Sequence, residues 1–318
     1  MGSNNKERFD VVSVGEILID FLPGEEEGSY IRNPGGAPAN FSIAAARNGL
    51  KSGIFCKAGD DDFGHFLMKT LKENEVEPLC EELCKDAITT MAFVSLTDKG
   101  ERSFTFARKP GADSLLALTD INDDIIRNSR LVHAGSCSLS KEPAASATVY
   151  ALKRGHEEGK LVSFDINYRD TMWENDKAAA TRKVNEILDY VDLLKVSEEE
   201  IDMLGDEQAV AELMAEKNIS CVVETLGGEG AKCFYDGEEI FVEGIKIDRV
   251  ADTTGAGDAF WGGFVSCLLL DNADKHGLDR EKVIKAARYG NVSGALCVQR
   301  KGAIAALPTR VEIEEFFN

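Results

Sequence analysis

The sequence lacks the patterns that mark several common nucleotide-binding and hydrolytic sites. No stretch of its 318 residues matches G-x-x-x-x-G-K-[ST], which excludes a P-loop at the level of the pattern. The stretch 227–233, GGEGAKC, lacks the third glycine of a dinucleotide-binding fingerprint. None of the four histidines lies in H-E-x-x-H, and no G-x-S-x-G elbow occurs. We therefore expect the histidines to be surface or core residues rather than ligands.

Paired cysteines and long apolar runs are also missing. The eight cysteines are scattered, none forms a Cys-x-x-Cys pair, and several lie inside apolar runs. This pattern predicts buried free thiols in a reducing compartment rather than disulfides or a zinc cluster. The segment 1–10 has no apolar signal-peptide core, and no apolar run is long enough to span a membrane. We therefore expect a soluble, cytoplasmic protein without a membrane partner.

Positive charge is in the minority. The chain has 36 Lys and Arg against 56 Asp and Glu, which gives a formal net charge of −20. Such a chain repels nucleic acid and anionic lipid, so we expect no nucleic-acid partner. A phosphate compound would have to be held by local backbone dipoles, a few basic side chains or a metal. Hydrophobic residues make up 43% of the chain, enough for a large core.

Short β-branched runs alternate with segments of helical spacing, as in the 184–191 stretch with apolar residues at i, i+3, i+4 and i+7. This alternation predicts an α/β fold with a mostly parallel sheet covered on both faces. In such sheets ligands collect at the carboxyl ends of the strands. The expected strands cover 10–15, 52–59, 130–135, 160–166, 192–197 and 220–227.

Two segments interrupt the alternation. The stretch 19–36 has turn residues and no helical spacing, and 88–113 has the pattern of two strands joined at TDKG. Together they could form a small antiparallel flap on the α/β domain, although an ordinary edge hairpin fits the same pattern. A further hairpin over 231–244 turns on Asp236-Gly237.

The stretch DTTGAGDAFWGGF, residues 252–264, joins a plausible strand at 245–250 to an apolar helix. The amides of Gly255, Ala256 and Gly257 would form an anion site at the start of that helix. Asp258 falls in its first turn, where the helix dipole favours the ionised carboxylate. It could accept a proton from a substrate hydroxyl while the amides hold a transferred phosphoryl group. Equally, Asp252 and Asp258 could merely cap the helix.

A second glycine-rich stretch, residues 33–50, places Gly35 and Gly36 before a helix rich in small residues. Two glycines permit a ligand to come close, and Asn40 offers both a donor and an acceptor, as a polyhydroxyl ligand would require. A tight turn with close helix packing would explain the same residues.

Together, the segments 35–64 and 252–264 resemble the two signature regions of the ribokinase-like, or PfkB, family of carbohydrate kinases. The resemblance runs from VGEILID to RKGAIAALP, nearly the whole chain. It is strongest to the fructokinase branch, in GEILIDF, RSFTFARKPGAD, FDINYRDTMW and KVSEEE. It implies a single three-layer α/β/α domain over 1–318, with an antiparallel β lid built from about 19–34 and 88–112. It also implies a homodimer through that lid.

The resemblance implies transfer of the ATP γ-phosphate to a hydroxyl group of a ketose, and its fructokinase character points to fructose. Acceptors such as 2-keto-3-deoxygluconate or ribose, or an idle sugar-binding regulator, remain alternatives. Asp258 would be the catalytic base, with Gly255, Ala256 and Gly257 as the anion hole and Arg169 meeting the ATP phosphates. An ion pair of Arg169 with a neighbouring acid is the structural alternative. The implied sugar contacts are Asp20, Gly35, Gly36, Asn40, Phe104, Phe106 and Arg108.

The resemblance also implies the groups that hold ATP and its metal ions. The nucleotide residues would be Asn167, Lys195, Thr225, Gly227, Gly230 and Asn291. Glu200 would belong to a Mg²⁺ site, and Asp252 and Thr254 to a K⁺ site. Two positions depart from the family pattern: Ser197 stands where an Asn is usual near Glu200, and AIAALP has alanine where a hydroxyl residue often follows the K⁺ loop.

Overall fold

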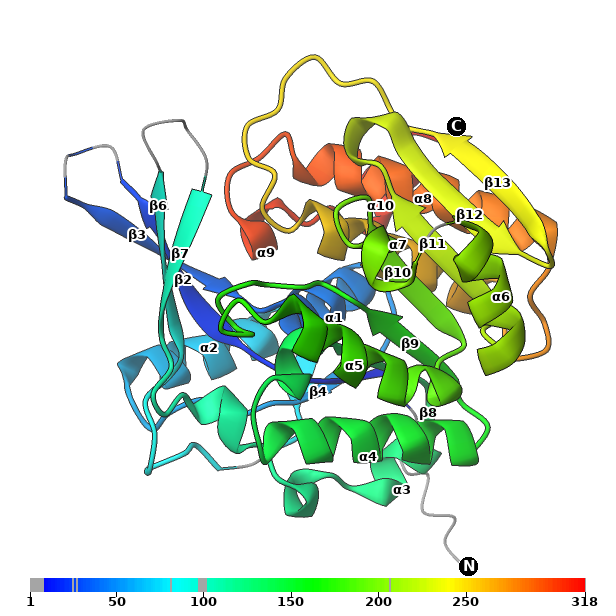
Figure 1. Ribbon diagram of the computed structural model, residues 1–318. Helices are drawn as coiled ribbons and strands as arrows, with labels where there is room; N and C mark the ends of the chain where they lie inside the picture. The colour runs from blue at the N-terminus through cyan, green and yellow to red at the C-terminus, as the bar shows by residue number, and fades with distance from the viewer. Residues whose placement is uncertain are drawn as a thin grey trace, which may run out of the picture.

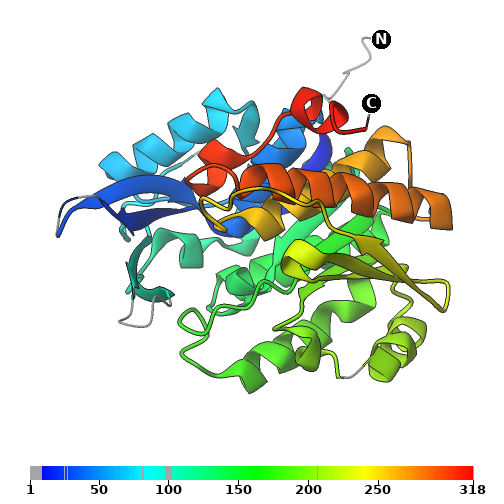
Figure 2. The same ribbon diagram turned by 90° about the horizontal axis from the view of Figure 1, so that it is seen from above.

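The structure is a computed structural model that describes residues 9–24, 26, 28–80, 82–96, 102–205 and 207–317. A nine-stranded sheet lies between two layers of helices, and a smaller four-stranded sheet stands beside it (Figures 1 and 2). The predicted α/β architecture with a separate small sheet is confirmed.

The large sheet is parallel from one edge to its seventh strand and ends in an antiparallel hairpin. Its order is β13-β12-β11-β10-β9-β8-β1-β4-β5, and only the pairs β11-β12 and β12-β13 are antiparallel. The strands are β1 (Phe9–Val14), β4 (Ser52–Phe55), β5 (Val76–Pro78), β8 (Ser129–Gly135), β9 (Leu161–Asp165), β10 (Leu193–Ser197), β11 (Cys221–Thr225), β12 (Gly230–Tyr235) and β13 (Glu238–Glu243).

One expected strand is wrong. Residues 245–250 form neither strand nor helix, and Val250 is 56% exposed. This segment runs over the surface after β13 without pairing to a strand, and only Ile245 packs against the core. The alternating pattern alone could not reveal that.

Successive residues of the central strands are buried on opposite faces of the sheet. Val12, Val162 and Leu194 belong to one hydrophobic cluster, while their neighbours Leu161 and Leu193 belong to another. This alternation follows from the period of two along a strand. Because both faces are covered, the strands consist mostly of apolar residues, as expected for a parallel sheet.

Four helices cover one face of the sheet: α3 (Asp123–Arg127), α4 (Ala144–Glu157), α5 (Lys177–Ile187) and α6 (Glu207–Lys217). The other face carries α1 (Ala37–Arg47), α2 (Asp62–Glu73), α7 (Ala256–Leu270) and α8 (Arg280–Cys297), with the short α9 (Ala303–Ala306) and α10 (Arg310–Glu314) beside them. Figure 2 shows the two layers edge-on, with the green helices below the sheet and the blue, cyan, orange and red ones above it.

Glycines bring α7 close to both of its neighbouring helices. A Cβ added at Gly262 would lie 2.4 Å from Cβ of Ala44 on α1, and one at Gly263 would lie 2.9 Å from Cβ of Ser293 on α8. Any side chain at either position would push the helices apart. The close packing fixes the start of α7 against the start of α1, and these two helix starts build the site described below.

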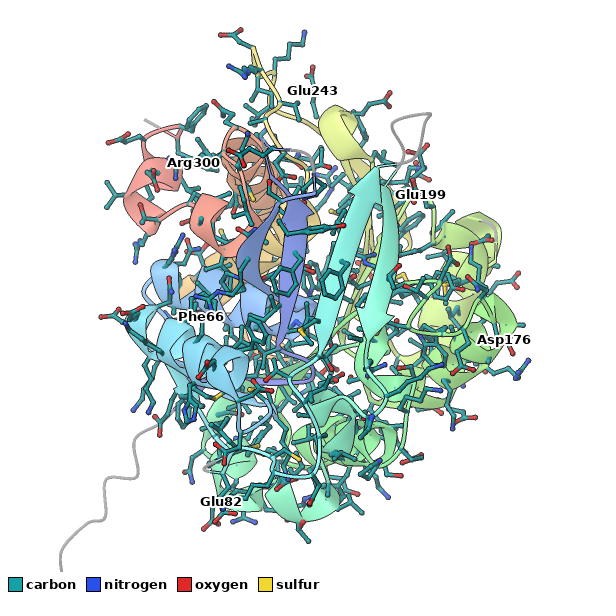
Figure 3. All side chains as sticks on the ribbon, turned by 90° about the vertical axis from the view of Figure 1, so that its left-hand side faces the viewer. Phe66, Glu82, Asp176, Glu199, Glu243 and Arg300 are labelled. Carbon is teal, nitrogen blue, oxygen red and sulfur yellow. The ribbon has the colours of Figure 1, made fainter. Side chains whose placement is uncertain are left out.

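The small sheet is made by the two segments that interrupt the α/β alternation. It contains β2 (Leu18–Pro23), β3 (Tyr30–Gly35), β6 (Met91–Leu96) and β7 (Arg102–Ala107) in the order β3-β2-β6-β7. Two antiparallel hairpins are joined through the parallel pair β2-β6. The expected turn at TDKG lies outside the described residues. Figure 3 views this sheet from the front, with Phe66 of α2 on its flank, where Arg32 of β3 stacks 3.9 Å from the Phe66 ring.

All eight cysteines are free thiols, six of them buried and two half-buried, as the scattered pattern predicts. In the part of the chain that the structure describes, no helix is long and apolar enough to cross a membrane.

Candidate active site

A cleft of about 930 Å³ lies between the small sheet and the carboxyl ends of the large sheet's strands. Its lining residues come from the small sheet, the loops after β1, β9, β10 and β11, and the starts of α1 and α7. Segments far apart in the sequence thus meet at the edge where ligands of parallel sheets bind. The predicted residues that line it are Asp20, Gly36, Asn40, Phe106, Asn167, Arg169, Lys195, Glu200, Thr225, Gly227, Thr254, Gly255, Gly257 and Asp258.

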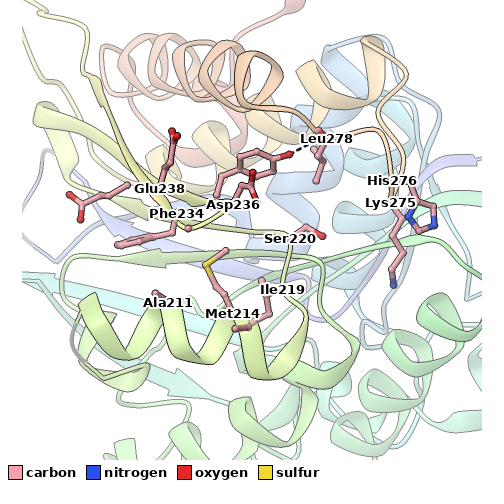
Figure 4. A pocket seen from close by; sticks show the side chains of 14 residues that line it. Ala211, Met214, Ile219, Ser220, Phe234, Asp236, Glu238, Lys275, His276 and Leu278 are labelled. Carbon is pink, nitrogen blue, oxygen red and sulfur yellow. Dashed lines mark hydrogen bonds between the residues drawn. The ribbon is translucent and has the colours of Figure 1, made fainter.

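A second hollow, of about 620 Å³, lies between α6, the β12-β13 hairpin and the 275–278 loop (Figure 4). Its floor is apolar, and two of its charged groups have partners: Glu238 binds Arg280, and Lys275 binds Asp192. None of the predicted site residues lines it. The cleft under the small sheet is therefore the candidate active site.

Asp258 is held at the floor of the cleft by two asparagine side chains. Nδ2 of Asn40 donates to Oδ2 over 2.7 Å, and Nδ2 of Asn167 donates to Oδ1 over 3.2 Å. Asn40 stands on α1, 218 positions away in sequence. Asn167 follows β9 with φ of 37°, a left-handed conformation that asparagine tolerates better than most residues. Each carboxylate oxygen is therefore fixed in direction.

The electrostatic environment of Asp258 differs from the expectation at one point. We expected the helix dipole to favour the ionised form, but burial raises the pKa of Asp258 above its usual 3.8. The hydrogen bond from Asn40 and the charge of Lys195 oppose that rise without cancelling it. A raised pKa makes the carboxylate a stronger proton acceptor, which suits a general base.

The pH dependence of catalysis should report this shift. Asp258 must be ionised to accept a proton, so kcat/KM should fall as the pH drops through its pKa, above the ordinary value for Asp. Asn40→Ala removes a bond that lowers this pKa, so the acid limb should move to higher pH. A pH profile of both proteins checks this. An unshifted acid limb in Asn40→Ala would show that another group controls it.

The glycine turn before Asp258 opens α7 toward the cleft. Gly255 has φ of 78°, and a Cβ there would lie 3.0 Å from Cβ of Ala303. Gly255 and Gly257 line the cleft, as predicted for an anion hole. Ala256 does not, because its amide donates to the carbonyl of Thr253 over 3.2 Å. The expectation of a free N–H at Ala256 is therefore wrong in this state of the protein.

The end of the cleft that is predicted to hold the acceptor is lined by alternate residues of β2. Leu18, Asp20 and Leu22 point the same way because of the strand's period of two. Burial raises the pKa of Asp20 to about 7. Gly35 does not line the cleft but makes room for this carboxyl: a Cβ there would lie 2.1 Å from Oδ2 of Asp20. Gly36, with φ of 107°, does line it.

The lid residues predicted to cover the sugar divide into three cases. Phe106 lines the cleft, and the side chain of Phe104 lies outside the described part of the chain. Arg108 does not reach the cleft. Its guanidinium donates to Asp113 over 2.9 Å and to Ser140 over 2.9 Å, which fixes it at the base of the lid. The expected sugar contact of Arg108 is thus replaced by an ion pair within the protein.

Lys195 is bound to an acid of the neighbouring strand. Its Nζ lies 2.9 Å from both carboxylate oxygens of Asp165, and both side chains are almost fully buried. Burial alone would lower the pKa of Lys195, but the charges of Asp165 and Glu200 raise it above its usual value. Lys195 therefore stays protonated and places a positive charge in the cleft wall.

The end of the cleft that is predicted to hold the nucleotide is formed by the loops after β9, β10 and β11. Arg169 lines the cleft and donates to the carbonyl of Tyr168, and the acid Glu174 pairs instead with Lys141. Thr225 and Gly227 also line it.

Two predicted nucleotide residues lie in the wall behind the cleft. Asn291 donates to the carbonyls of Val242 and Glu243, both over 3.1 Å. Gly230 packs so closely that a Cβ would lie 2.1 Å from the Val242 oxygen. Both residues hold β13 in place rather than facing a ligand.

The predicted metal residues occupy two separate places. Glu200 lines the cleft, and its oxygens accept the amides of Tyr168 over 2.7 Å and Ser197 over 2.9 Å. Asp252 lies behind the glycine turn, where Oδ1 accepts from the Thr254 hydroxyl over 2.7 Å and Oδ2 from the Gly302 amide over 3.0 Å. The structure thus brings the 252–254 loop against the segment near 302.

Several lining residues were not predicted, among them Glu16, Cys137 and Thr253. Glu16 lies in the motif GEILIDF, four residues before Asp20 on the other side of a short loop. An acidic residue beside a strand rich in apolar residues was the available signal. Cys137 could not have been found, because nothing in its local sequence sets it apart from a core thiol.

Comparison with known proteins assigns the chain to a family. Residues 8–310 match the pfkB family carbohydrate kinase domain. The chain belongs to this family. It is 37% identical over 326 residues to a protein of Arabidopsis thaliana described as probable fructokinase-2, covering 99% of this chain and 98% of the relative.

Two solved structures described as fructokinases share the fold over nearly the whole chain. One is the fructokinase of Xylella fastidiosa with bound ATP, with a TM-score of 0.89 at 29% identity over 97% of this chain and 98% of that one. The other is the fructokinase of Vibrio cholerae O395 with fructose, ADP and a calcium ion, with a TM-score of 0.86 at 34% identity over 98% and 99%.

Proposed function

We propose that this pfkB-family protein is an ATP-dependent kinase that transfers the ATP γ-phosphate to a hydroxyl group of fructose. The observation that carries the proposal is Asp258, fixed by Asn40 and Asn167 at the floor of the cleft and beside the start of α7. The similarity to fructokinases across the full length of both chains supports the choice of acceptor. ATP bound to the Xylella fructokinase supports the choice of donor.

The reaction follows from the geometry. Asp258 accepts the proton of the sugar hydroxyl, whose oxygen attacks the γ-phosphorus while the bond to the β-phosphate oxygen breaks and ADP leaves. The amides of Gly255 and Gly257, at the positive end of the α7 dipole, face the negative charge of the transferred group. Arg169 supplies a further positive charge at the phosphate end. Val94 and Phe106 of the small sheet exclude water, so that the phosphoryl group goes to the sugar.

A magnesium ion fits the phosphate end of the cleft. When bound, it neutralises the phosphate oxygens that the acidic protein would otherwise repel. Magnesium in such sites usually keeps several waters and takes one or two carboxylates. Glu200 is a suitable residue, because its two backbone hydrogen bonds hold the carboxylate in place while it lines the cleft. Ser197 holds Glu200 through its backbone amide. This hydrogen bond does not depend on the Asn side chain that is usual at position 197.

A potassium ion would belong behind the glycine turn. Asp252 and Thr254 lie against the segment at Gly302, so that oxygen ligands from both loops can converge there. The bound cation would add positive charge behind the anion hole. The alanines of 303–306 supply no hydroxyl, so the remaining ligands would have to be backbone carbonyls.

A homodimer through the small sheet is supported by an aromatic cluster on its outer face. Phe21 stacks on Phe93 with ring centroids 4.9 Å apart, and Tyr30, 47% exposed, packs edge-on against both. Such a cluster on an open sheet face is typical of a protein interface. Light scattering that gives a monomeric mass at assay concentrations would contradict the dimer.

A coupled ATP-to-ADP assay with a panel of acceptors tests the function. Fructose should give the highest kcat/KM, above 2-keto-3-deoxygluconate, ribose and adenosine. Turnover should require Mg²⁺, and K⁺ should raise the rate more than Na⁺ at equal ionic strength. A higher kcat/KM with another acceptor would reassign the substrate. Sugar binding without ADP formation would indicate a regulator rather than a kinase.

A further inference from the structure

Glu16 is a buried carboxyl in the wall of the cleft that the mechanism above does not use. Its side chain is 3% exposed, it lines the acceptor end, and its Oε2 has no hydrogen-bond partner in the described protein. Buried polar groups in folded proteins nearly always have a partner, because an unpaired one loses its hydration without compensation. The unpaired Oε2 of Glu16 therefore indicates that a bound ligand supplies the missing hydrogen bond.

The backbone on both sides of Glu16 packs closely against α1. A Cβ at Gly15 would lie 2.6 Å from Cγ of Pro38, and one at Gly36 would lie 2.5 Å from the carbonyl oxygen of Glu16. The loop therefore packs directly against the first turn of α1. The position of the Glu16 backbone is therefore set by the helix that also carries Asn40.

The nearby basic group is already engaged. Arg108 influences Glu16 electrostatically, but its guanidinium donates to Asp113 and Ser140. Asp113 and Asp258 surround Glu16 with further negative charge. Burial, followed by these two charges, raises the pKa of Glu16 to about 7, against the opposing effects of a backbone hydrogen bond and Arg108. Near neutral pH the carboxyl therefore exists in both protonation states, and its neutral form can donate as well as accept a hydrogen bond.

We propose that the carboxyl of Glu16 binds a hydroxyl group of the acceptor sugar beside Asp258. The proposal rests on the sugar kinase function above and adds a specificity residue to it. A sugar hydroxyl is both donor and acceptor, so it matches a carboxyl in either protonation state. The contact would satisfy a group that the free protein leaves unpaired, so it favours acceptors with a hydroxyl at that position over those without one.

Two variants test the contact. Glu16→Met keeps an unbranched side chain of similar size but removes both oxygens, and Glu16→Gln keeps a donor and an acceptor. We expect Glu16→Met to raise the fructose KM about tenfold with the KM for ATP unchanged, and Glu16→Gln to stay close to wild type. Because Met buries no unpaired oxygen, the free Glu16→Met protein should melt at a higher temperature than wild type.

The sharpest measurement pairs these variants with singly deoxygenated fructoses. Wild type should lose about tenfold in kcat/KM with one analogue, the one that lacks the contacted hydroxyl. Glu16→Met should lose nothing further with that same analogue, because the interaction is already gone. Thr148→Val on α4 is the matched control: it removes another buried oxygen without a partner, outside the cleft, and should leave both KM values unchanged.

Each outcome of these measurements either supports or overturns the role of Glu16. An unchanged fructose KM in Glu16→Met would overturn the inference while leaving the kinase function intact. A Glu16→Met protein that fails to fold would overturn it as well, because the carboxyl would then be bonded within the protein. If wild type turned over no sugar of the panel, the proposed function would fall, and the inference with it.

Discussion

Asp258→Asn should lower the turnover number by a factor of about 10²–10⁴ or more, the usual contribution of a positioned general base. The amide is the same size as the carboxylate and keeps an oxygen for the Nδ2 donor of Asn40, although it loses the acceptor of the longer bond from Asn167. What is lost is the ability to take the proton of the sugar hydroxyl. Binding of fructose and ATP, measured by calorimetry, should change little.

Asp271→Asn is the matched control for this substitution. Asp271 caps the other end of the same helix, where it pairs with Lys285 over 2.6 Å at the surface. The same chemical change there should leave the rate near that of wild type. A near-normal rate in Asp258→Asn would remove Asp258 from its role as base, and equal losses in both variants would point to the helix rather than the carboxylate.

Lys195→Met should destabilise the protein by about 3–5 kcal/mol, because it leaves the charge of Asp165 buried without its partner. The two side chains are only 5% and 3% exposed, so little solvent reaches the carboxylate that loses its partner. Urea unfolding at neutral pH measures the change. Replacing both partners, in Lys195→Met with Asp165→Leu, should recover much of the stability, since the unpaired charge of Asp165 is then gone.

The control is an ion pair of the same kind at the surface. Lys183 and Glu186 on α5 lie 2.9 Å apart with side chains 44% and 59% exposed. Lys183→Met should change the free energy of unfolding by less than about 1 kcal/mol, because solvent screens the pair. If Lys195→Met proved no more costly than Lys183→Met, the buried pair would contribute nothing net to the fold.

The arrangement of the elements followed from local patterns. The alternation of apolar strands with amphipathic helices predicts a parallel sheet covered on both faces, and the interruptions at 19–36 and 88–113 predict the small sheet. Gly255 and Gly257 predict a helix start whose backbone a ligand can approach, because glycine has no side chain and allows unusual backbone angles. These features depend on neighbours within about ten positions, which a sequence displays directly. The surface segment 245–250 failed because its exposure depends on what lies next to it.

The tertiary structure alone decided which predicted residues face the ligand. Asp258 and Asn40 meet because Gly262 allows α7 to pack tightly on α1, a contact between distant segments. Arg108 has the right charge for a ligand but is taken up by Asp113, and the Ala256 amide by Thr253. This competition for hydrogen-bond partners arises only when the chain is folded. The same holds for the burial that raises the pKa values of Asp20 and Asp258. The sequence therefore identified the chemical groups of the site. Tertiary packing determined which groups pair with one another and how their pKa values shift.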